Sequence, residues 1–480
     1  MGYFASKTGQ PAPRAHRIDP RIVRANDLRG EYGRTLGEAD AAAIGFAFAR
    51  RAATRTPARI AVGYDGRLSS PALEEAVVNG LIAGGAEVLR VGLGPAPMLY
   101  FAVHRHDLDG GVMITGSHNA PEINGIKLLQ GKRPLAGAEL AELVAAAAEA
   151  APGEQRGSVR DFLMMTPYLE ALRASWRGGR EMRIAWDPGH GATAELVCRL
   201  AAALPGRHFV INDTIDGRFP DHAPDPTRRE NLDHLIRTVR RNNCEIGLAF
   251  DGDGDRLGVV TGEGGVAWAD QLVALFAEEV LQARPGAAVV IDIKASEAVR
   301  RHIRGAGGRP VLSASGRGFV WRAMQESAAP LGGEMSGHIF FADRSYGYDD
   351  ALYAAIRLLS LLARGPQTLA ERLDLLPRSC ATPELRIPCD PELQQRILND
   401  VGRQLAERPD VEVMRLDGLH VTEQDGWWLL RSSNTEDVLV ARCEAADRPA
   451  LERVLSLVRG HLGRYQIATD CLSSDTAGQS

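Results

Sequence analysis

The sequence contains very little lysine. Arginine supplies almost all of the 56 basic residues, and the four lysines are Lys7, Lys127, Lys132 and Lys294. Arginine keeps its proton near neutral pH, whereas a lysine in a suitable environment can release one. A lysine inside a chemical motif of this chain is therefore more informative than usual.

Cysteine is also scarce, and its spacing is uninformative. The six cysteines occur singly, and no two of them form a C-x-x-C pair. A disulfide framework or a cysteine-based zinc site is therefore not expected. This usage is typical of the reducing cytoplasm, which we predict as the location.

Long apolar runs and an excess of positive charge are missing as well. No run approaches the roughly 20 apolar residues of a spanning helix, and the polar N-terminal segment does not resemble a secretory signal. The formal net charge is −5, which argues against a general nucleic-acid binder. We expect small-molecule partners, with neither membrane nor nucleic acid. A monomer is compatible with the sequence, which does not indicate an oligomeric state.

A strand–loop–helix–strand pattern occurs three times, starting near residues 60, 184 and 289. Each first strand ends at an aspartate: Asp65, Asp187 or Asp292. Such alternation predicts βαβ units and α/β domains with mixed, largely parallel sheets. The last hundred residues instead predict a smaller α+β domain with an antiparallel sheet. The expected domains are 1–163, 164–265, 266–377 and 378–480.

The first chemical motif is GGVMITGSHNAPEINGIKLL. An apolar strand leads into small residues around Ser117, which a tight loop would expose as a nucleophile or phosphate acceptor. Lys127 follows ten residues later. An ordinary polar turn is the alternative interpretation.

The second motif is EIGLAFDGDGDRLGVV. In an extended chain, alternation would point Asp251, Asp253 and Asp255 the same way, and a cation is needed to offset their repulsion. Oxygen ligands of this kind suit Mg²⁺. A calcium loop is excluded because Arg256 and Gly262 replace the required glycine and glutamate. The alternative is an acidic surface turn.

Two later motifs carry polar groups suited to sugars and phosphates. In GGEMSGHIFF, Glu334 and Ser336 can bind vicinal hydroxyls and His338 can move protons; the alternative is a helix N-terminus. In GWWLLRSSNTEDVLV, a strand delivers Arg431 and neighbouring hydroxyls into a loop suited to a phosphate dianion; the alternative is a polar hairpin loop.

The usual nucleotide-binding motifs are missing. The sequence has no G-x-x-x-x-G-K-[ST] loop, and Leu257 occupies the last position of a potential G-x-G-x-x-G. Phosphate-binding groups without a nucleotide site favour a phosphoryl transfer that needs no external donor.

In this order, the four motifs resemble the α-D-phosphohexomutase superfamily. The match extends from NDLRG at 26–30 to CEA at 443–445 and includes VGYDGRLSS, GPAPMLYF and DGRFPDHAPDPTRRENL. The form GEMSGH resembles the bacterial phosphomannomutase/phosphoglucomutase branch. The resemblance implies a heart-shaped molecule of four domains, with one motif from each domain in a central cleft.

The resemblance also implies an activity. Hexose 1- and 6-phosphates of mannose or glucose would be interconverted through a phosphoserine and a bound 1,6-bisphosphate, which also serves as activator, with one Mg²⁺ per chain. The implied catalytic residues are Ser117, Lys127, His338, Arg29 and His118. The implied substrate-binding residues are Glu334, Ser336, Lys294, Arg256, Arg431, Ser433, Asn434 and Thr435. The implied metal ligands are Ser117, Asp251, Asp253 and Asp255.

Some residues depart from the family pattern. Asn26 replaces a common tyrosine, Arg317 a frequent histidine and Asp437 the usual proline. None of them is a nucleophile or a metal ligand, so activity is expected. Alternatives are the same chemistry on glucosamine phosphate, a Mg²⁺-dependent phosphatase, and a non-catalytic sugar-phosphate sensor. Ser117 and the three aspartates argue against the sensor.

Overall fold

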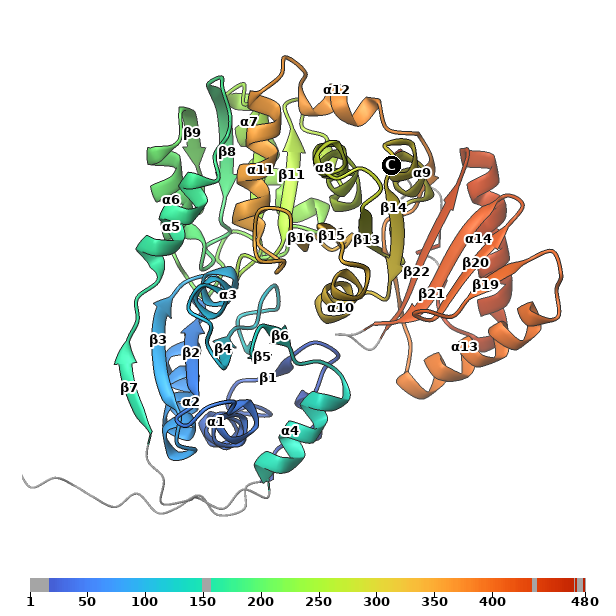
Figure 1. The fold of residues 1–480 in the computed structure, drawn as a ribbon. Helices are drawn as coiled ribbons and strands as arrows, with labels where there is room; N and C mark the ends of the chain where they lie inside the picture. The colour runs from blue at the N-terminus through green and yellow to red at the C-terminus, as the bar shows by residue number, and fades with distance from the viewer. Residues whose placement is uncertain (1–16, 149–156, 434–437, 470, 473–477, 480) are drawn as a thin grey trace, which may run out of the picture. The chain divides into compact units, whose positions relative to one another are not determined.

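The computed structural model describes residues 17–148, 157–433, 438–469, 471–472 and 478–479. The chain divides into two compact units, Met1–Thr166 and Pro167–Ser480, whose helices and strands are labelled in Figure 1. Within the described residues, no helix combines the length and the apolarity that crossing a membrane requires.

The first unit contains one seven-stranded mixed sheet. Its strands are Leu28–Glu31 (β1), Arg59–Tyr64 (β2), Glu87–Leu93 (β3), Gly110–Ile114 (β4), Ile123–Gln130 (β5), Arg133–Pro134 (β6) and Ser158–Asp161 (β7). The order is β1-β5-β4-β2-β3-β7, and β6 pairs with β5. β2 runs parallel to β3 and β4, whereas β5 is antiparallel to β4 and β1.

Four helices cover this sheet. They are Glu38–Ala52 (α1), Ser70–Ala83 (α2), Ala96–Arg105 (α3) and Ala138–Ala148 (α4). Side chains alternate along a strand, so Ile60 and Val62 of β2 face the same side. Both belong to the core that α1, α2 and α4 complete. α3 contacts β2 and β4 and brings none of its residues into that core.

The second unit contains three sheets. The strands of the first two are Met182–Asp187 (β8), Gly206–Val210 (β9), Ile246–Phe250 (β10), Leu257–Thr261 (β11), Val266–Ala267 (β12), Ala288–Asp292 (β13), Arg309–Ser313 (β14), Leu331–Gly333 (β15) and Ile339–Phe341 (β16). Their orders are β12-β11-β10-β8-β9 and β14-β13-β15-β16. Each combines parallel pairs with an antiparallel edge. Both sheets are therefore mixed, as predicted.

In the third sheet of this unit, neighbouring strands pair in antiparallel fashion. Its strands are Cys380–Ala381 (β17), Leu385–Pro388 (β18), Glu412–Met414 (β19), Leu419–Glu423 (β20), Gly426–Ser432 (β21), Val438–Ala445 (β22) and Gly478–Gln479 (β23). The order is β19-β20-β21-β22-β17-β23, and β18 pairs with β22. This confirms the predicted C-terminal α+β domain.

Helices surround these sheets, and polar side chains cap several of them. The α-helices are Met165–Ala174 (α5), Ala194–Ala203 (α6), Asp233–Arg241 (α7), Ala269–Ala283 (α8), Glu297–Gly305 (α9), Arg317–Ser327 (α10), Ala351–Ala363 (α11), Leu369–Asp374 (α12), Pro391–Ala406 (α13) and Arg448–Leu462 (α14). Asp390 and Asp447 cap α13 and α14, each directly before the first turn that contains a proline.

The three predicted βαβ repeats are present as β2–α2–β3, β8–α6–β9 and β13–α9–β14. The two strands of each repeat pair in parallel. The first strand of each repeat leads into its loop at an aspartate. β8 and β13 end at Asp187 and Asp292, and Asp65 directly follows β2. These loops lie beside the segments that carry the candidate functional residues.

Candidate active site

The loop between β4 and β5 carries Ser117. Its φ of 51° lies in the left-handed region, which a side chain other than glycine seldom adopts. Thr115 Oγ1 accepts a hydrogen bond of 2.7 Å from the backbone N–H of Ser117. The hydroxyl of Ser117 lies 3.3 Å from Nδ1 of His118. A specific backbone conformation therefore fixes where this hydroxyl points.

Cationic side chains from neighbouring strands approach this loop. Arg29 on β1 donates to Oδ1 of Asn119 and, over 2.6 Å, to Oδ2 of Asp27. Lys127 is buried on β5, where its register partner is Met113 of β4. The first unit thus brings Arg29 and His118 to the serine loop and places Lys127 on the adjacent strand.

The carboxylates of Asp251, Asp253 and Asp255 converge directly after β10. All three residues are fully buried, and one oxygen of each lies within 4.8 Å of those of the others. The expected convergence is confirmed, but its expected cause, an extended chain, is wrong. The backbone turns at Gly254, whose φ is 74°, and the N–H groups of Asp255 and Arg256 donate to Oδ1 of Asp251 over 3.0 and 3.1 Å.

These three carboxylates fit a divalent cation. Three buried anions at this spacing repel one another, and repulsion is strong away from water. Carboxylate oxygens are the ligands that hard cations such as Mg²⁺ prefer. Residues Asp251, Asp253 and Asp255 would hold such an ion.

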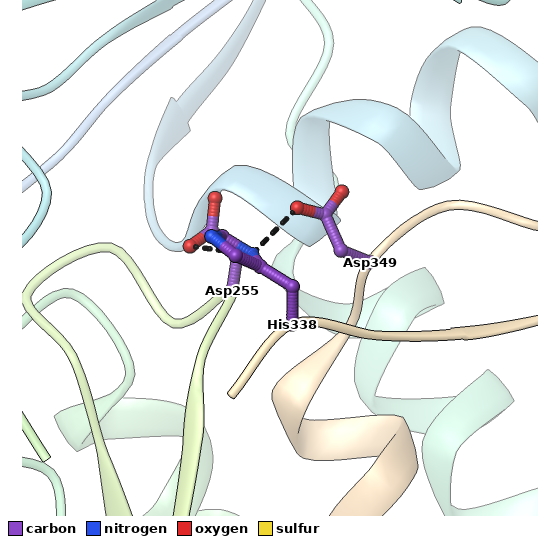
Figure 2. A group of neighbouring side chains, drawn as sticks. All are labelled: Asp255, His338 and Asp349. Carbon is purple, nitrogen blue, oxygen red and sulfur yellow. Dashed lines mark ion pairs between the residues drawn. The ribbon is translucent and has the colours of Figure 1, made fainter. Parts of the chain in front are cut away.

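His338 lies between this acidic cluster and a residue that the sequence analysis did not assign, Asp349 (Figure 2). Its Nδ1 is 2.9 Å from Oδ2 of Asp349 and 3.5 Å from Oδ1 of Asp255. Its Nε2 accepts a hydrogen bond of 3.1 Å from Nε of Arg256. Nε2 also lies 4.0 Å from Oε2 of Glu334. Because the arginine can only donate, its hydrogen bond assigns a lone pair to Nε2 and the proton of the neutral ring to Nδ1.

Glu334 and Ser336 belong to the hairpin that connects β15 and β16, so the alternative of a helix N-terminus is excluded. Oε1 of Glu334 accepts from the backbone N–H of Gly316, and its Oε2 lies 3.4 Å from the hydroxyl of Ser336. Glu334 is 3% exposed. The pair presents a carboxylate and a hydroxyl, which are groups that suit sugar hydroxyls.

Lys294 follows β13 and is buried between two carboxylates. Its Nζ lies 2.9 Å from Oε2 of Glu384 and 3.6 Å from Oδ2 of Asp292. Burial works against its charge, yet the two carboxylates raise the pKa of Lys294. Burial also disfavours the charge of Glu384, but Lys294 lowers the pKa of that carboxyl to about 2. Lys294 is thus held as a cation.

Arg431 occupies the end of β21. Its Nε donates over 2.8 Å to Oδ2 of Asp417, which also accepts the backbone N–H of Ser315 over 2.9 Å. The N–H of Ser433 donates to the carbonyl of Val438. The predicted phosphate-binding residues Asn434 and Thr435 lie outside the described residues, as does the departure Asp437.

Family models match the chain in sequence order. Phosphoglucomutase/phosphomannomutase alpha/beta/alpha domains I, II and III match residues 20–152, 166–264 and 268–379, and the C-terminal domain of the same family matches 392–460. The chain belongs to the phosphoglucomutase/phosphomannomutase family. This family membership confirms the resemblance seen in the four motifs.

Similar proteins agree with this phosphoglucomutase/phosphomannomutase membership. A phosphoglucomutase of Neisseria gonorrhoeae is 40% identical over 90% of this chain and 95% of its own length. A phosphomannomutase/phosphoglucomutase of Pseudomonas aeruginosa is 36% identical over 94% and 97%. A crystal structure of a phosphoglucomutase/phosphomannomutase family protein from Burkholderia thailandensis is 37% identical, covers 93% of this chain and 98% of its own, and has a TM-score of 0.87.

Within the second unit, hydrogen bonds link several candidate residues of this phosphoglucomutase/phosphomannomutase family member. Asp292, beside Lys294, accepts the N–H of Met335 over 3.3 Å, and so holds the loop of Glu334. Asp417 joins Arg431 to Ser315. The sequence analysis missed Asp349, Asp417 and, in the first unit, Arg67. The only sequence signal for Arg67 is its place two residues after a strand-end aspartate.

Proposed function

We propose that this protein interconverts the 1- and 6-phosphates of glucose and mannose. Phosphorylated Ser117 gives its phosphoryl group to the free hydroxyl of the sugar phosphate and forms a hexose 1,6-bisphosphate. After this intermediate has turned around, its other phosphoryl group returns to Ser117. The names of the relatives support both sugars as substrates, and glucose or mannose 1,6-bisphosphate is the proposed activator.

The chain supplies the groups for each proton and charge in this transfer. The phosphorus–oxygen bond to Ser117 breaks as a bond to the sugar oxygen forms. Nε2 of His338 takes the proton of the sugar hydroxyl, and Lys127 gives a proton to the departing Ser117 oxygen. Asp349, at Nδ1, stabilises the resulting imidazolium. Lys127 and Arg29 supply positive charge near the serine loop, and His118 lies beside the hydroxyl itself.

One Mg²⁺ held by Asp251, Asp253 and Asp255 supplies stabilisation of the negative charge that spreads over a transferring phosphoryl group. The fourth predicted ligand, a phosphoryl oxygen on Ser117, rests on the family resemblance. Arg256 donates to Nε2 of His338 over 3.1 Å and must release this lone pair before His338 can take the proton of the sugar hydroxyl.

The remaining candidates hold the sugar phosphate in place. Glu334 and Ser336 bind hydroxyls, while Arg431, Ser433 and Lys294 bind the phosphate that does not react. The proposed phosphate site also includes Asn434 and Thr435. Because either end of the intermediate must occupy this site in turn, recognition there depends on charge rather than on a particular carbon atom.

The proposal includes four domains with the predicted boundaries and a location in the cytoplasm. The first two boundaries fall between matched family segments, and the third lies just inside the end of the third segment. Free thiols at Cys198, Cys244, Cys380, Cys389 and Cys443 support a reducing compartment.

The observation that carries the function is the buried carboxylate triad with His338 at its edge, because three buried anions that can hold a divalent cation and an adjacent histidine suit phosphoryl transfer. The test is intact-mass measurement before and after incubation with glucose 1,6-bisphosphate and Mg²⁺. We expect one added phosphoryl group on the native chain and on the exposed-site control Ser158→Ala, but none on Ser117→Ala, which also loses mutase activity. An active native enzyme that never carries the added group would contradict the proposal.

A further inference from the structure

Arg67 lies beneath the loop that carries Ser117, and its guanidinium donates to backbone carbonyls of that loop. The side chain is fully buried. Its Nη1 donates to the carbonyls of Ala120 and Ile123 over 2.6 and 2.8 Å. Its Nη2 donates to the carbonyls of Ser117 and Asn119, both over 2.7 Å. One guanidinium therefore binds four backbone carbonyls of a single loop.

We infer that Arg67 is a positioning residue that sets the conformation of the nucleophile loop and so the place of the Ser117 hydroxyl. This inference rests on the proposed function of Ser117. Because its side chain is fully buried, Arg67 acts through the backbone of the loop.

Arginine is suited to this arrangement in a way that lysine is not. A guanidinium is planar and offers five donors in fixed directions, whereas an ammonium offers three donors around one point. Four carbonyls spread over residues 117–123 can be reached by the two terminal nitrogens of a fork. A single ammonium nitrogen has too few donors to replace all four hydrogen bonds.

Asp65 completes the arrangement by holding both Arg67 and the start of the loop. Its Oδ2 lies 3.3 Å from Nε of Arg67 and accepts the N–H of Gly116 over 3.3 Å. Its Oδ1 accepts the N–H of Arg67 and the hydroxyl of Ser70 over 3.0 and 2.5 Å. The buried charge of Arg67 is thus compensated by a carboxylate that is itself hydrogen-bonded on both oxygens.

The close approach of Arg67 to the loop requires glycine at position 116. A Cβ on Gly116 would lie 2.6 Å from Cζ of Arg67 and 2.4 Å from the carbonyl oxygen of Ile123. The next residue, Ser117, adopts the left-handed conformation, which costs free energy and persists only when its surroundings impose it. Arg67, which binds the carbonyl of Ser117 itself, is the group best placed to impose it.

This position matters because the proposed reaction uses the same hydroxyl twice, first as leaving group and then as acceptor. Both transfers need the attacking and leaving oxygens in line with phosphorus. A displacement of about 1 Å at such a site can slow a reaction about 100-fold. Loss of the Arg67 contacts should therefore reduce turnover with little effect on substrate affinity.

The test compares Arg67→Lys with a matched control, Arg55→Lys, at an arginine of the same unit that binds Asp109 and the carbonyl of Asp107. For Arg67→Lys we expect kcat to fall about 10- to 100-fold, with KM within about threefold and phosphorylation of Ser117 slowed by the same factor as kcat. Arg55→Lys should change none of these. Thermal unfolding and circular dichroism verify that both variants are folded.

Two further measurements separate positioning from general damage. Hydrogen exchange of residues 115–124 should be faster in Arg67→Lys than in the native chain or the control. Ethylguanidinium added to Arg67→Ala should restore part of the lost kcat. If native protein is phosphorylated on Ser117 and Arg67→Lys reacts at the native rate, this inference fails while the proposed function stands. If the native protein is never phosphorylated there, both fail.

Discussion

The first and third βαβ repeats place the same pair of residue types after their first strand but use the basic residue differently. Asp65 and Arg67 follow β2, and Asp292 and Lys294 occupy the end of β13 and the turn beyond it. Arg67 binds four backbone carbonyls. Lys294 instead lies between carboxylates.

The two aspartates, by contrast, make the same kind of contact, because each accepts a backbone N–H from a loop with candidate functional residues. Asp65 accepts the N–H of Gly116 in the serine loop, and Asp292 accepts the N–H of Met335 in the loop of Glu334. The strand-end aspartate thus fixes a functional loop in both repeats. The basic residue two positions later differs in its partners. The forked guanidinium of Arg67 suits several backbone acceptors, whereas the ammonium of Lys294 suits a compact group of carboxylates.

The largest difference between the repeats should appear on removal of these aspartates. Asp65→Asn leaves the fully buried Arg67 without its carboxylate, and breaking such a pair costs about 3–5 kcal/mol. Asp292→Asn should lower the free energy of unfolding by about 1 kcal/mol. The loss is smaller because burial already raises the pKa of Asp292 and because Lys294 retains its ion pair with Glu384. Chemical denaturation followed by circular dichroism measures both. Equal losses would show that the two aspartates do not differ in this way.

The second difference concerns how each repeat's neighbourhood holds a reactive group. Backbone hydrogen bonds position Ser117, whereas the side chain of Asp349 positions His338. A nearly isosteric substitution of Asp349 should therefore impair the reaction step that uses His338. Asp349→Asn should lower kcat about 10- to 100-fold, the usual effect of removing a carboxylate that orients a histidine, and leave the melting temperature nearly unchanged. Steady-state kinetics tests this. A kcat within a factor of two of native would remove Asp349 from the mechanism.

The third difference is between substrate affinity and turnover. Lys294→Met removes a cation that we place at the non-reacting phosphate, so KM for glucose 1-phosphate should rise about tenfold, equivalent to about 1.4 kcal/mol. The fall in kcat should be smaller. Arg67→Lys is expected to show the opposite division between kcat and KM. If both variants changed mainly kcat, or both mainly KM, the proposed contrast between Arg67 as a positioning residue and Lys294 as a phosphate-binding residue would be wrong.

The smallest effect should depend on pH and involve Lys294 of the third repeat. Lys294 lowers the pKa of Glu384 to about 2 despite burial, from an ordinary value of 4.5. The contribution of the Lys294–Glu384 ion pair to the stability of the fold is therefore complete above pH 4.5 and is lost as the pH falls through about 2. A quarter of this side chain is exposed, so solvent limits the effect to about 1 kcal/mol. Glu384→Gln should remove that part of the acid dependence of the melting temperature.

The sequence was sufficient for the parts of the structure that depend on local patterns. Short apolar runs ending at Asp65, Asp187 and Asp292 predicted the three βαβ repeats, and spacing alone predicted that Asp251, Asp253 and Asp255 converge. The prediction of an extended chain there failed because Gly254 allows a turn with positive φ.

Non-local contacts explain what the sequence analysis missed. A β-bridge between Phe340 and Asp349 brings Asp349 to His338, and no local pattern encodes that pairing. Arg67 was overlooked because arginine is abundant in this chain and its partners are backbone carbonyls, which every residue possesses. A positioning role of this kind becomes visible only when the path of the whole loop is known.

The scarcity of lysine has a practical consequence for measuring how the protein opens in solution. Lys127 and Lys294 are 2% and 5% exposed, whereas nearly half of the Lys132 side chain reaches solvent. An acylating reagent should therefore modify Lys132 before Lys127 and Lys294, so that the reaction of Lys132 serves as an internal reference for these two. The ratio of acylation rates at Lys127 and Lys132 reports how often the strand beside the serine loop becomes accessible, without any residue being substituted.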